Sequence, residues 1–502
     1  PGLIMFRVND RPEWLSRHVF PGASILLPGV LIVGGLAGIV LGYLVLSGLW
    51  YIGVVIVVAF PALILIHRHP FLAVIIWLLV TPFLLHAETS TARYVYWAVH
   101  RGLPVLTLGI IVLSDGLLMR RRSLPRPGPA EVAMLGYVLV SVMSIAWQNG
   151  NPVATFYLFY DRIIVSMCLY LIIRLIEPDD GEMRWLPAAA VFVVLTQSAI
   201  GILSQFVPGL LPSSWMENAG ARTVGTLINA AIYTIALMFG GLILVHAAQQ
   251  VNSGRQRALY VLCFLLMVYC TFISFSRASW LAGAAVCGIL LLVYPRFMMR
   301  LGLLVVPLGL LVGGVLFSSQ IAWARERLYS AEAENSANSR LPIIAGAYNM
   351  FLEKPVAGWG YGNFDLYDRS FYGVLLGSAG DSRDHASHNY FLTILAEQGL
   401  LGLSLYLFPM FYWLARSLRR YGAMPKAGLR SRKLLIMLWL VILFHIIVSN
   451  FINMIVVYGL GIWWITLGLI GYLVQDEGLQ EASRVTAAAS RPGEIQVFAG
   501  GD

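Results

Sequence analysis

The sequence predicts an all-α, polytopic membrane protein with 12–14 transmembrane helices and one large loop on a single side of the membrane. Its 502 residues are 59% hydrophobic and only 12% charged, whereas soluble proteins are nearer half apolar and a quarter charged. Apolar runs long enough to cross a bilayer recur from Ser24 to Val474. Successive connecting loops are alternately rich and poor in basic residues, which is typical of membrane topology.

The individual spans follow from a minimum length of about 17–20 apolar residues. Fourteen segments satisfy it, at residues 24–45, 48–66, 70–86, 103–119, 130–147, 159–176, 185–206, 224–246, 257–274, 278–294, 301–317, 390–415, 434–449 and 452–474. All four cysteines lie inside these segments. We therefore expect them to be buried or lipid-facing, and to form neither a disulfide nor a metal site.

The positive-inside rule orients the chain. One alternating set of loops, together with the termini, holds most of the 34 lysines and arginines, whereas the short loops of the other set hold only Arg93, Arg101, Arg162, Arg222 and Arg277. The rule predicts a cytoplasmic N-terminus (1–23), transmembrane helices over 24–317 and 390–474, an outer loop over 318–389 and a disordered cytoplasmic tail (475–502). The net charge of +9 is explained by this topology, so no nucleic-acid partner is expected.

The outer loop contains one predicted helix, at residues 341–353, within "SRLPIIAGAYNMFLEKP". Ser339 is a suitable N-cap, Pro342 is tolerated in the first turn and Pro355 ends the helix. One face carries an apolar stripe formed by Ile343, Ile344, Ala347, Met350 and Phe351. Such a helix should lie along the outer membrane interface, above the bundle. A glycine-rich turn, "GWGYGNF", follows it.

Two outer arginines are candidates for binding an anionic ligand. Arg222 lies in "NAGARTVGTLINAAIY", and Arg277 lies in "FISFSRASWL", a turn without an acidic residue. The alternative is that each snorkels to the interface or forms a structural ion pair. Two such arginines suit a diphosphate, because the planar guanidinium binds it through paired, charge-assisted hydrogen bonds.

His385 and His388 lie where the outer loop enters the next apolar helix. A metal site would need Asp381 or Asp384 as a further ligand, which makes it the weaker interpretation. A histidine with a near-neutral pKa at the water–membrane boundary could instead act as an acid or base on a sugar hydroxyl. A structural role, in capping the helix or anchoring it at the interface, is also open.

The residues after His388 have simpler interpretations. Ser387 and Asn389 could cap the helix that follows. Glu397, Gly399 and Gly402 are expected to serve close helix packing rather than chemistry. The sequence contains no P-loop, G-x-S-x-G or H-E-x-x-H motif, and the outer loops contain no D-x-D motif.

Four segments together resemble a known family. "HNYFLTILAEQGLLG" matches the signature H-[N/S/Q]-x9-G-x-x-[G/T/Y], and "SRLPIIAGAYNMFLEKPVAGWGYGNF" resembles an R…a…m…P…G.G.g.f segment. "ARTVGTLIN" resembles R-x-x-G-T-x-x-N, and "SFSRASWLAG" resembles S-R-x-x-W. In this order they resemble the bacterial O-antigen ligase and O-antigen polymerase (Wzy-C) superfamily, over residues 218 to 405.

This resemblance implies a GT-C-like glycosyltransferase without a metal or cofactor, in the bacterial inner membrane and active on its periplasmic side. The implied donor is a glycan on undecaprenyl diphosphate. The implied acceptor is lipid A-core for a ligase, a second lipid-linked glycan for a polymerase, or a protein for a third type of member. Carried over by motif position, Arg222 and Arg277 would hold the diphosphate, with Arg340 as a further candidate, and His388 would act on the acceptor hydroxyl. His385 and Asn389 would support the site.

A transporter or flippase of lipid-linked sugars is the rival outside the enzyme class. It would require ionisable residues near mid-membrane or paired interrupted helices. The sequence disfavours it, because the polar groups cluster on one face and the spans look uninterrupted.

Overall fold

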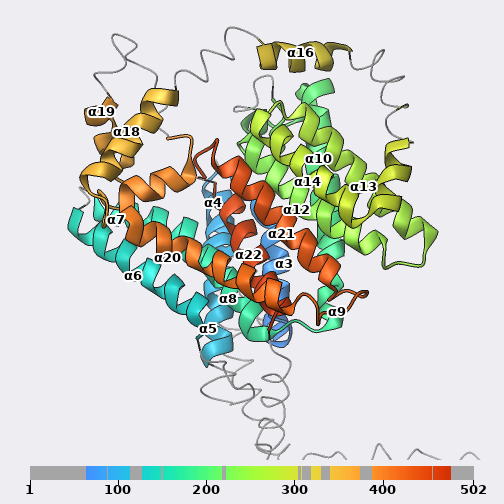
Figure 1. Ribbon diagram of the computed structural model, residues 1–502, viewed down its shortest axis with the longest axis horizontal. Helices are drawn as coiled ribbons and strands as arrows, with labels where there is room; N and C mark the ends of the chain where they lie inside the picture. Colours follow the sequence, from blue (N-terminus) through green and yellow to red (C-terminus); the bar gives the residue numbers. More distant parts are fainter. Residues whose placement is uncertain are drawn as a thin grey trace, which may run out of the picture. The chain divides into compact units, whose positions relative to one another are not determined.

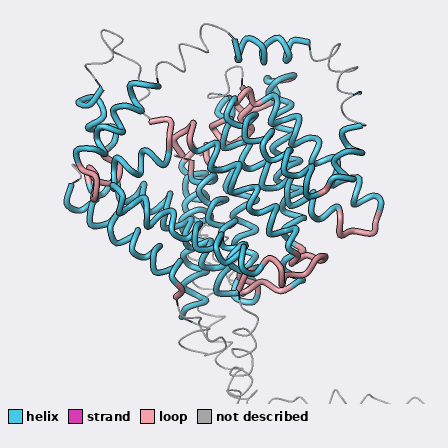
Figure 2. The backbone as a smooth tube through the Cα atoms, in the orientation of Figure 1, coloured by secondary structure: helices cyan, strands magenta, loops and turns pink. Residues whose placement is uncertain are grey.

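The computed structural model describes residues 64–86, 89–113, 127–148, 151–216, 222–303, 307, 318–329, 340–372, 387–454 and 456–475. The chain divides into two units, Pro1–Arg68 and His69–Asp502. In the first unit only residues 64–68 are described, and they are helical. Every feature below belongs to the second unit, whose described residues form helices and loops but no strand (Figure 2).

The helices of the second unit are shown in Figure 1. They are α3 (Phe71–Leu84), α4 (Ser90–Tyr96), η2 (Trp97–Gly102), α5 (Leu103–Ile110), α6 (Pro129–Gln148), α7 (Pro152–Phe159), η4 (Tyr160–Ile164), α8 (Val165–Ile176), α9 (Asp180–Met183), α10 (Trp185–Phe206), η5 (Pro208–Leu210), α11 (Ser213–Met216), α12 (Ala230–Ala248), α13 (Gly254–Ile273), α14 (Arg277–Val293), α16 (Ser318–Tyr329), α18 (Arg340–Glu353), α19 (Phe364–Tyr372), α20 (Tyr390–Arg420), α21 (Arg432–Ser449) and α22 (Val457–Leu473).

Among the described residues, eight helical stretches are long and apolar enough to cross a membrane, or nine if one bent pair counts as a span. The protein is therefore an all-α polytopic membrane protein, as predicted. The first predicted span, nearly all of the second and most of 301–317 lie outside the described residues. The count of 12–14 spans, the division into parts and the orientation remain predictions.

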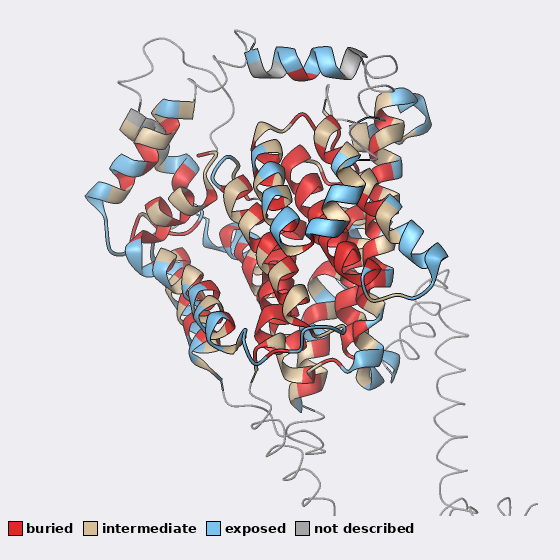
Figure 3. Ribbon diagram, turned by 45° about the vertical axis from the view of Figure 1, so that its right-hand side comes forward, coloured by how far each residue is buried: buried red, intermediate tan, exposed pale blue. Residues whose placement is uncertain are grey.

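The centre of the bundle is formed by α12 and α22, which are buried along their whole length (Figure 3). Both helices are apolar on every face, which is expected of helices surrounded by other helices. Small residues let their neighbours approach closely. For example, a Cβ at Gly461 would overlap the indole of Trp77 in α3.

α21 runs antiparallel to both α12 and α14, against which it packs. Just before α21, the Gly428 N–H donates to the Gln250 side chain, just after α12, at 3.0 Å. Lys433, in the first turn of α21, lies 4.7 Å above the ring of Tyr294, just after α14. The end of α21 therefore lies beside the starts of α12 and α14 (Figure 1). We call this end of the bundle, where α12 and α14 begin and α21 ends, the motif end.

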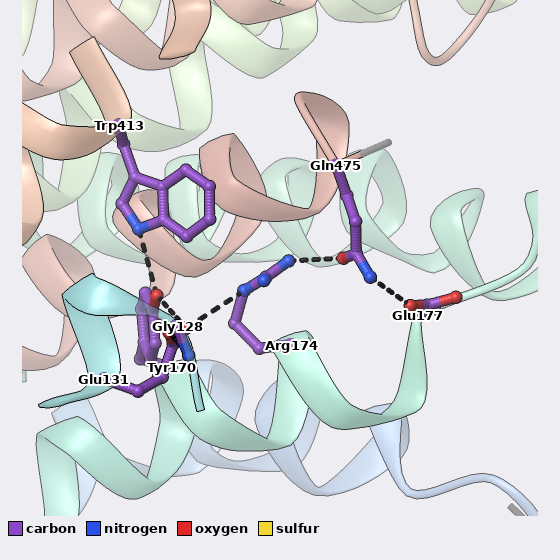
Figure 4. A network of polar contacts seen from close by, with 7 residues as sticks. All are labelled: Gly128, Glu131, Tyr170, Arg174, Glu177, Trp413 and Gln475. Carbon is purple, nitrogen blue, oxygen red and sulfur yellow. Dashed lines mark hydrogen bonds and ion pairs between the residues drawn. The ribbon is translucent and has the colours of Figure 1, made fainter. Parts of the chain in front are cut away.

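A polar network ties four helices together at the opposite end (Figure 4). Glu131 of α6 accepts hydrogen bonds from the Tyr170 hydroxyl at 2.7 Å and from Arg174 Nε at 3.4 Å, both in α8. Trp413 of α20 donates to the Tyr170 hydroxyl at 2.9 Å, and its ring lies 4.7 Å from the Arg174 guanidinium. Gln475, just after α22, accepts from Arg174. Glu131 pairs with Arg174, so the charge of this arginine is compensated within the protein.

Arg101 and Arg162 lie in helices, which corrects the expectation that both belong to short loops. The corresponding helical stretches are Thr91–Leu113 and Pro152–Ile176, and both arginines lie well inside them, in the π-helical segments η2 and η4. Arg101 is tolerated there because it forms a two-fold ion pair with Asp161, at 2.5 and 2.6 Å. Its guanidinium also lies over the rings of Trp97 and Tyr157, 5.1 and 5.6 Å from their centres.

α20 is broken at Gly399, which corrects the expectation of uninterrupted spans. Gly399 has φ 63° and ψ −164°, which no helix contains. The rings of Tyr390 and Tyr406 are 5.7 Å apart, although sixteen residues of straight helix would separate them by about 24 Å. The first nine residues, 390–398, therefore form a half-helix that folds back against the rest of α20. A second interruption, of 119°, separates Arg277–Val293 from Pro295–Leu303.

α18 confirms the helix predicted in the outer loop. The predicted apolar stripe is its buried face: Ile343, Ala347 and Met350 are buried, and Ile344 and Phe351 are half-buried. This face packs with Phe364 of α19 and with Ala396 of the half-helix of α20. The proposed N-cap, Ser339, lies outside the described residues.

Candidate functional site

The segment before α12 explains the R-x-x-G-T-x-x-N pattern residue by residue. Arg222 is half-buried at its start. Gly225 has φ 57°, and a Cβ there would overlap the Gln197 side chain. The same Gln197 accepts from Thr226 N at 3.1 Å and donates to its hydroxyl at 2.8 Å. Asn229 is the N-cap of α12 and accepts from the second residue of the helix at 2.8 Å. The pattern thus fixes the backbone between Arg222 and the start of α12.

The S-R-x-x-W pattern forms the start of α14. Ser276 is the N-cap, and Arg277 is the first helical residue and half-buried. Trp280 closes the turn by donating to the carbonyls of Thr271 and Phe272, at 3.1 and 3.0 Å. One turn into each helix, the hydroxyls of Thr234 in α12 and Ser279 in α14 are 2.7 Å apart. The starts of α12 and α14 are therefore held together.

The H-N pair forms the start of α20. Asn389 is the N-cap and accepts from Leu392 N at 3.0 Å, which confirms the capping role expected of it. The Ser387 hydroxyl accepts from Asn389 N at 3.2 Å and hydrogen-bonds the Thr393 hydroxyl. His388, half-buried, lies between these two fixed residues. Its position is set by the backbone on either side.

The turn after α21 brings α18 and α20 to the motif end. Asn389 Nδ2 donates to Asn450 Oδ1 at 3.3 Å, and Arg340 Nη1 lies 3.5 Å from the Phe451 carbonyl oxygen. Because Asn450 and Phe451 directly follow α21, the starts of α18 and α20 lie at the same end of the bundle as the starts of α12 and α14. Four segments that are far apart in the sequence therefore meet at one end of the bundle.

A strained backbone marks three of these segments. In the described chain four non-glycine residues have positive φ: Glu177, Ile228 (65°), Phe275 (49°) and His388 (53°). The last three each stand directly before an N-cap, namely Asn229, Ser276 and Asn389. Left-handed backbone at a non-glycine residue costs about 1–3 kcal/mol, persists where the surrounding structure imposes it, and clusters at functional sites. A β-branched or bulky residue there is a genuine outlier.

The glycine-rich turn after α18 inserts into the break of α20. Trp359 N and Gly360 N donate to the carbonyls of Ala396 and Glu397, at 3.1 and 2.6 Å, and Leu400 N and Leu401 N donate to the carbonyls of Pro355 and Val356, at 2.8 and 3.2 Å. In a continuous helix, the N–H groups of 400 and 401 would bind the carbonyls of 396 and 397. Segment 355–360 therefore replaces two helical hydrogen bonds with four of its own. We call this arrangement the interlock.

Two glycines make the interlock sterically possible. A Cβ at Gly399 would overlap the Val356 carbonyl group and lie 2.7 Å from the Pro355 carbonyl oxygen. A Cβ at Gly358 would overlap the Glu397 carbonyl group. Both have positive φ, of 63° and 67°, which glycine adopts without strain. Gly399 was expected to serve close helix packing; instead it breaks α20 and lies against segment 355–360.

Glu397 is buried beside the interlock. Its carboxylate accepts from Phe364 N, the first residue of α19, at 3.2 Å, and from the N–H of Gly362. The nearby Tyr361 is hydrogen-bonded to the Arg162 guanidinium. Burial raises the pKa of Tyr361 to about 12, although Arg162 lowers it. Its hydroxyl is therefore neutral at ordinary pH, and the cluster serves structure through hydrogen bonds.

The structure thus collects five of the six predicted site residues at the motif end: Arg222, Arg277, Arg340, His388 and Asn389. His385 lies outside the described residues, as do Asp381 and Asp384. The described residues contain no group of three or more His, Cys, Asp or Glu that could hold a metal.

Sequence reasoning missed three groups that shape the site. Gln197 and Asn450 are amides at positions in or beside apolar spans, which was the available signal. Glu397 was assigned to packing only, whereas its carboxylate also holds the start of α19.

Comparison with known proteins gives the same family that the sequence motifs resemble. Residues 262–407 match the family model described as O-antigen ligase. The match includes Arg277, Arg340, His388 and the whole interlock, whereas Arg222 precedes it. No curated protein matches the chain. Residues 262–407 of this multi-pass membrane protein are therefore similar to the O-antigen ligase family.

Proposed function

We propose that the protein is a glycosyltransferase of the bacterial inner membrane that moves a glycan from undecaprenyl diphosphate to an acceptor sugar hydroxyl on the periplasmic side. We assign it to the O-antigen ligase type, with lipid A-core as acceptor. The observation that carries this proposal is the convergence of Arg222, Arg277, Arg340 and His388 at the motif end.

The donor diphosphate would lie at the starts of α12 and α14. Arg277 is the first residue of α14, and Arg222 lies on the segment that leads into α12. Helix starts carry a partial positive charge, and arginine binds phosphate oxygens in pairs. Both contributions would stabilise the negative charge that develops on the leaving diphosphate.

The acceptor would be activated at the start of α20. Its hydroxyl would donate a hydrogen bond to the His388 ring and attack the anomeric carbon of the donor glycan. A new glycosidic bond forms, the bond from the anomeric carbon to the diphosphate oxygen breaks, and the proton passes to His388. Attack opposite the leaving group inverts the anomeric centre. Histidine is suited to this transfer because imidazole can take up and release a proton near neutral pH.

A deletion strain tests the assignment to a ligase. Loss of a ligase leaves long glycan chains on undecaprenyl diphosphate, whereas loss of a polymerase leaves single repeat units attached to lipid A-core. Polymerase is the second candidate because it would use the same residues. Gel analysis of lipopolysaccharide and of the lipid-linked pool separates the two outcomes.

Transport also requires a test, because two observations now weaken the sequence argument against it. α20 is interrupted, and the Arg101–Asp161 pair lies inside helical stretches. Vesicles that hold the protein, with the donor already on the active face, should yield glycosylated acceptor. A protein that only moves the donor across the bilayer would yield none.

A further inference from the structure

The position of His388 depends on the interlock. His388 stands directly before the half-helix 390–398, whose other end is the break at Gly399. The half-helix folds back so far that Tyr390 packs against Tyr406, and Tyr406 stacks on Trp463 of α22 at 6.3 Å. This direction brings Asn389 to Asn450, at the end of α21. The fold-back therefore delivers His388 to the motif end.

Without segment 355–360 no backbone hydrogen bond would stabilise the break in α20. The N–H groups of Leu400 and Leu401 would bind the carbonyls of Ala396 and Glu397, as in any continuous helix. The start of α20 would then lie about 24 Å from Tyr406 along a straight axis, instead of against it. The four hydrogen bonds of the interlock are what oppose this straightening.

Glu397 fixes the other side of the same junction. Its buried carboxylate accepts from the first N–H of α19 at 3.2 Å, while its backbone carbonyl accepts from Gly360 N at 2.6 Å. One residue therefore binds both the inserted segment and the helix that follows it. α18 and α19 pack on the same half-helix through Met350, Phe364 and Ala396.

We propose that the interlock is the device that positions His388 for glycan transfer, and that Gly358, Gly399 and Glu397 are its positioning residues. The inference rests on the proposed function and extends it, because none of these three residues needs to contact a substrate. The half-helix, α18 and α19 pack together as one unit. The way in which this unit packs on the rest of the bundle sets the position of His388 at the motif end.

The first test replaces Gly399 by alanine. A Cβ there overlaps the Val356 carbonyl group, and alanine disfavours the left-handed backbone. We expect kcat for transfer in proteoliposomes to fall about 100-fold, as for a misplaced catalytic group. The KM for the donor should change far less, because Arg222 and Arg277 lie on other elements. Gly422→Ala is the matched control, since nothing lies within 4 Å of a Cβ at that position.

A disulfide reports the interlock independently of activity. Val356 and Leu400 are both exposed, and they lie on the two sides of the interlock, in segment 355–360 and directly after Gly399. In a background without native cysteines, Val356→Cys with Leu400→Cys should crosslink on oxidation, with full activity retained. The crosslink should be lost when Gly399→Ala is added. If transfer cannot be detected in any variant while the crosslink behaves as stated, the proposed function fails and the interlock does not.

Glu397 separates positioning from chemistry. Glu397→Gln keeps an oxygen that accepts from the start of α19, so we expect kcat within a few-fold of the parent and the same dependence on pH. Glu397→Leu removes the acceptor and should lower kcat as Gly399→Ala does. The proposal is overturned if Gly399→Ala loses the crosslink without losing kcat. It is equally overturned if Glu397→Gln abolishes transfer while the crosslink still forms.

Discussion

His388 combines a titratable ring with a backbone conformation that histidine seldom adopts. Its φ of 53° belongs to the left-handed region, in which histidine, asparagine and aspartate occur more often than other non-glycine residues. The conformation lets Asn389 cap α20 while His388 itself remains outside the helix. A substitution at this position must therefore preserve the backbone if it is to report on the ring.

For this reason His388→Asn is the better test of the proposed base than His388→Ala. Asparagine tolerates the left-handed backbone but cannot take up a proton at neutral pH. We expect transfer to fall about 10²–10⁴-fold, the usual contribution of a general base, with the thermal unfolding midpoint unchanged. Rates in proteoliposomes and unfolding in detergent check the two parts. Full transfer by this variant would exclude His388 as the base.

Arg277 provides a second test at the residue scale. If it binds two diphosphate oxygens at once, Arg277→Lys keeps the charge but loses the paired geometry. We expect both Arg277→Lys and Arg277→Gln to lower kcat by about 10²–10³-fold, by analogy with the loss of one oxyanion donor. Single-turnover rates at saturating donor would show this. A lysine variant with parental kcat would mean that charge alone suffices.

At the scale of the element, α12, α14 and α20 begin in the same way. Each has a left-handed residue, then a capping side chain, then the helix. The left-handed residue turns the incoming chain sharply, so that a loop can approach the helix start from the side. The strained residues at the three helix starts thus allow three loops to converge.

Ile228 allows the strain to be measured. Alanine at this position would retain the left-handed strain, whereas glycine would release it. We expect Ile228→Gly to be more stable than Ile228→Ala by about 1 kcal/mol, the reverse of the order found inside helices. Chemical unfolding in detergent gives the difference. An alanine variant that is the more stable of the two would argue against strain at this residue.

At the scale of the whole unit, we expect one end of the bundle to contribute to catalysis and the other end to contribute to stability. The motif end collects the candidate site residues, whereas the opposite end holds the Glu131–Arg174 network. Stability and chemistry should therefore respond separately to mutation at the two ends.

Glu131→Ala tests this separation. It leaves Arg174 and the Tyr170 hydroxyl without their shared carboxylate acceptor. Loss of a partly buried acceptor typically costs about 1–3 kcal/mol, so the unfolding midpoint should fall. Transfer per folded molecule should not change. A fall in kcat at a temperature where the variant is fully folded would show that the two ends are coupled.

The sequence predicted correctly those features that depend on local composition and spacing. The apolar length of the spans, the amphipathic stripe of α18 and the capping role of Asn389 follow from local composition, and the structure contains all three. The prediction failed for Arg101 and Arg162, because partners that are distant in the sequence, Asp161 for Arg101 and Tyr361 for Arg162, decide whether a charge can enter a helix. It also failed for α20, since the break depends on a segment 40 residues earlier that no local pattern reveals.

The fold-back of α20 gives a meaning to the spacing in H-N-x9-G. The nine residues from Tyr390 to Gln398 are the full length of the half-helix. Their number therefore sets the distance between Gly399, which is held by the interlock, and His388. One inserted residue would rotate His388 by about 100° and shift it by about 1.5 Å. The number of residues should therefore be far less tolerant of change than their identity.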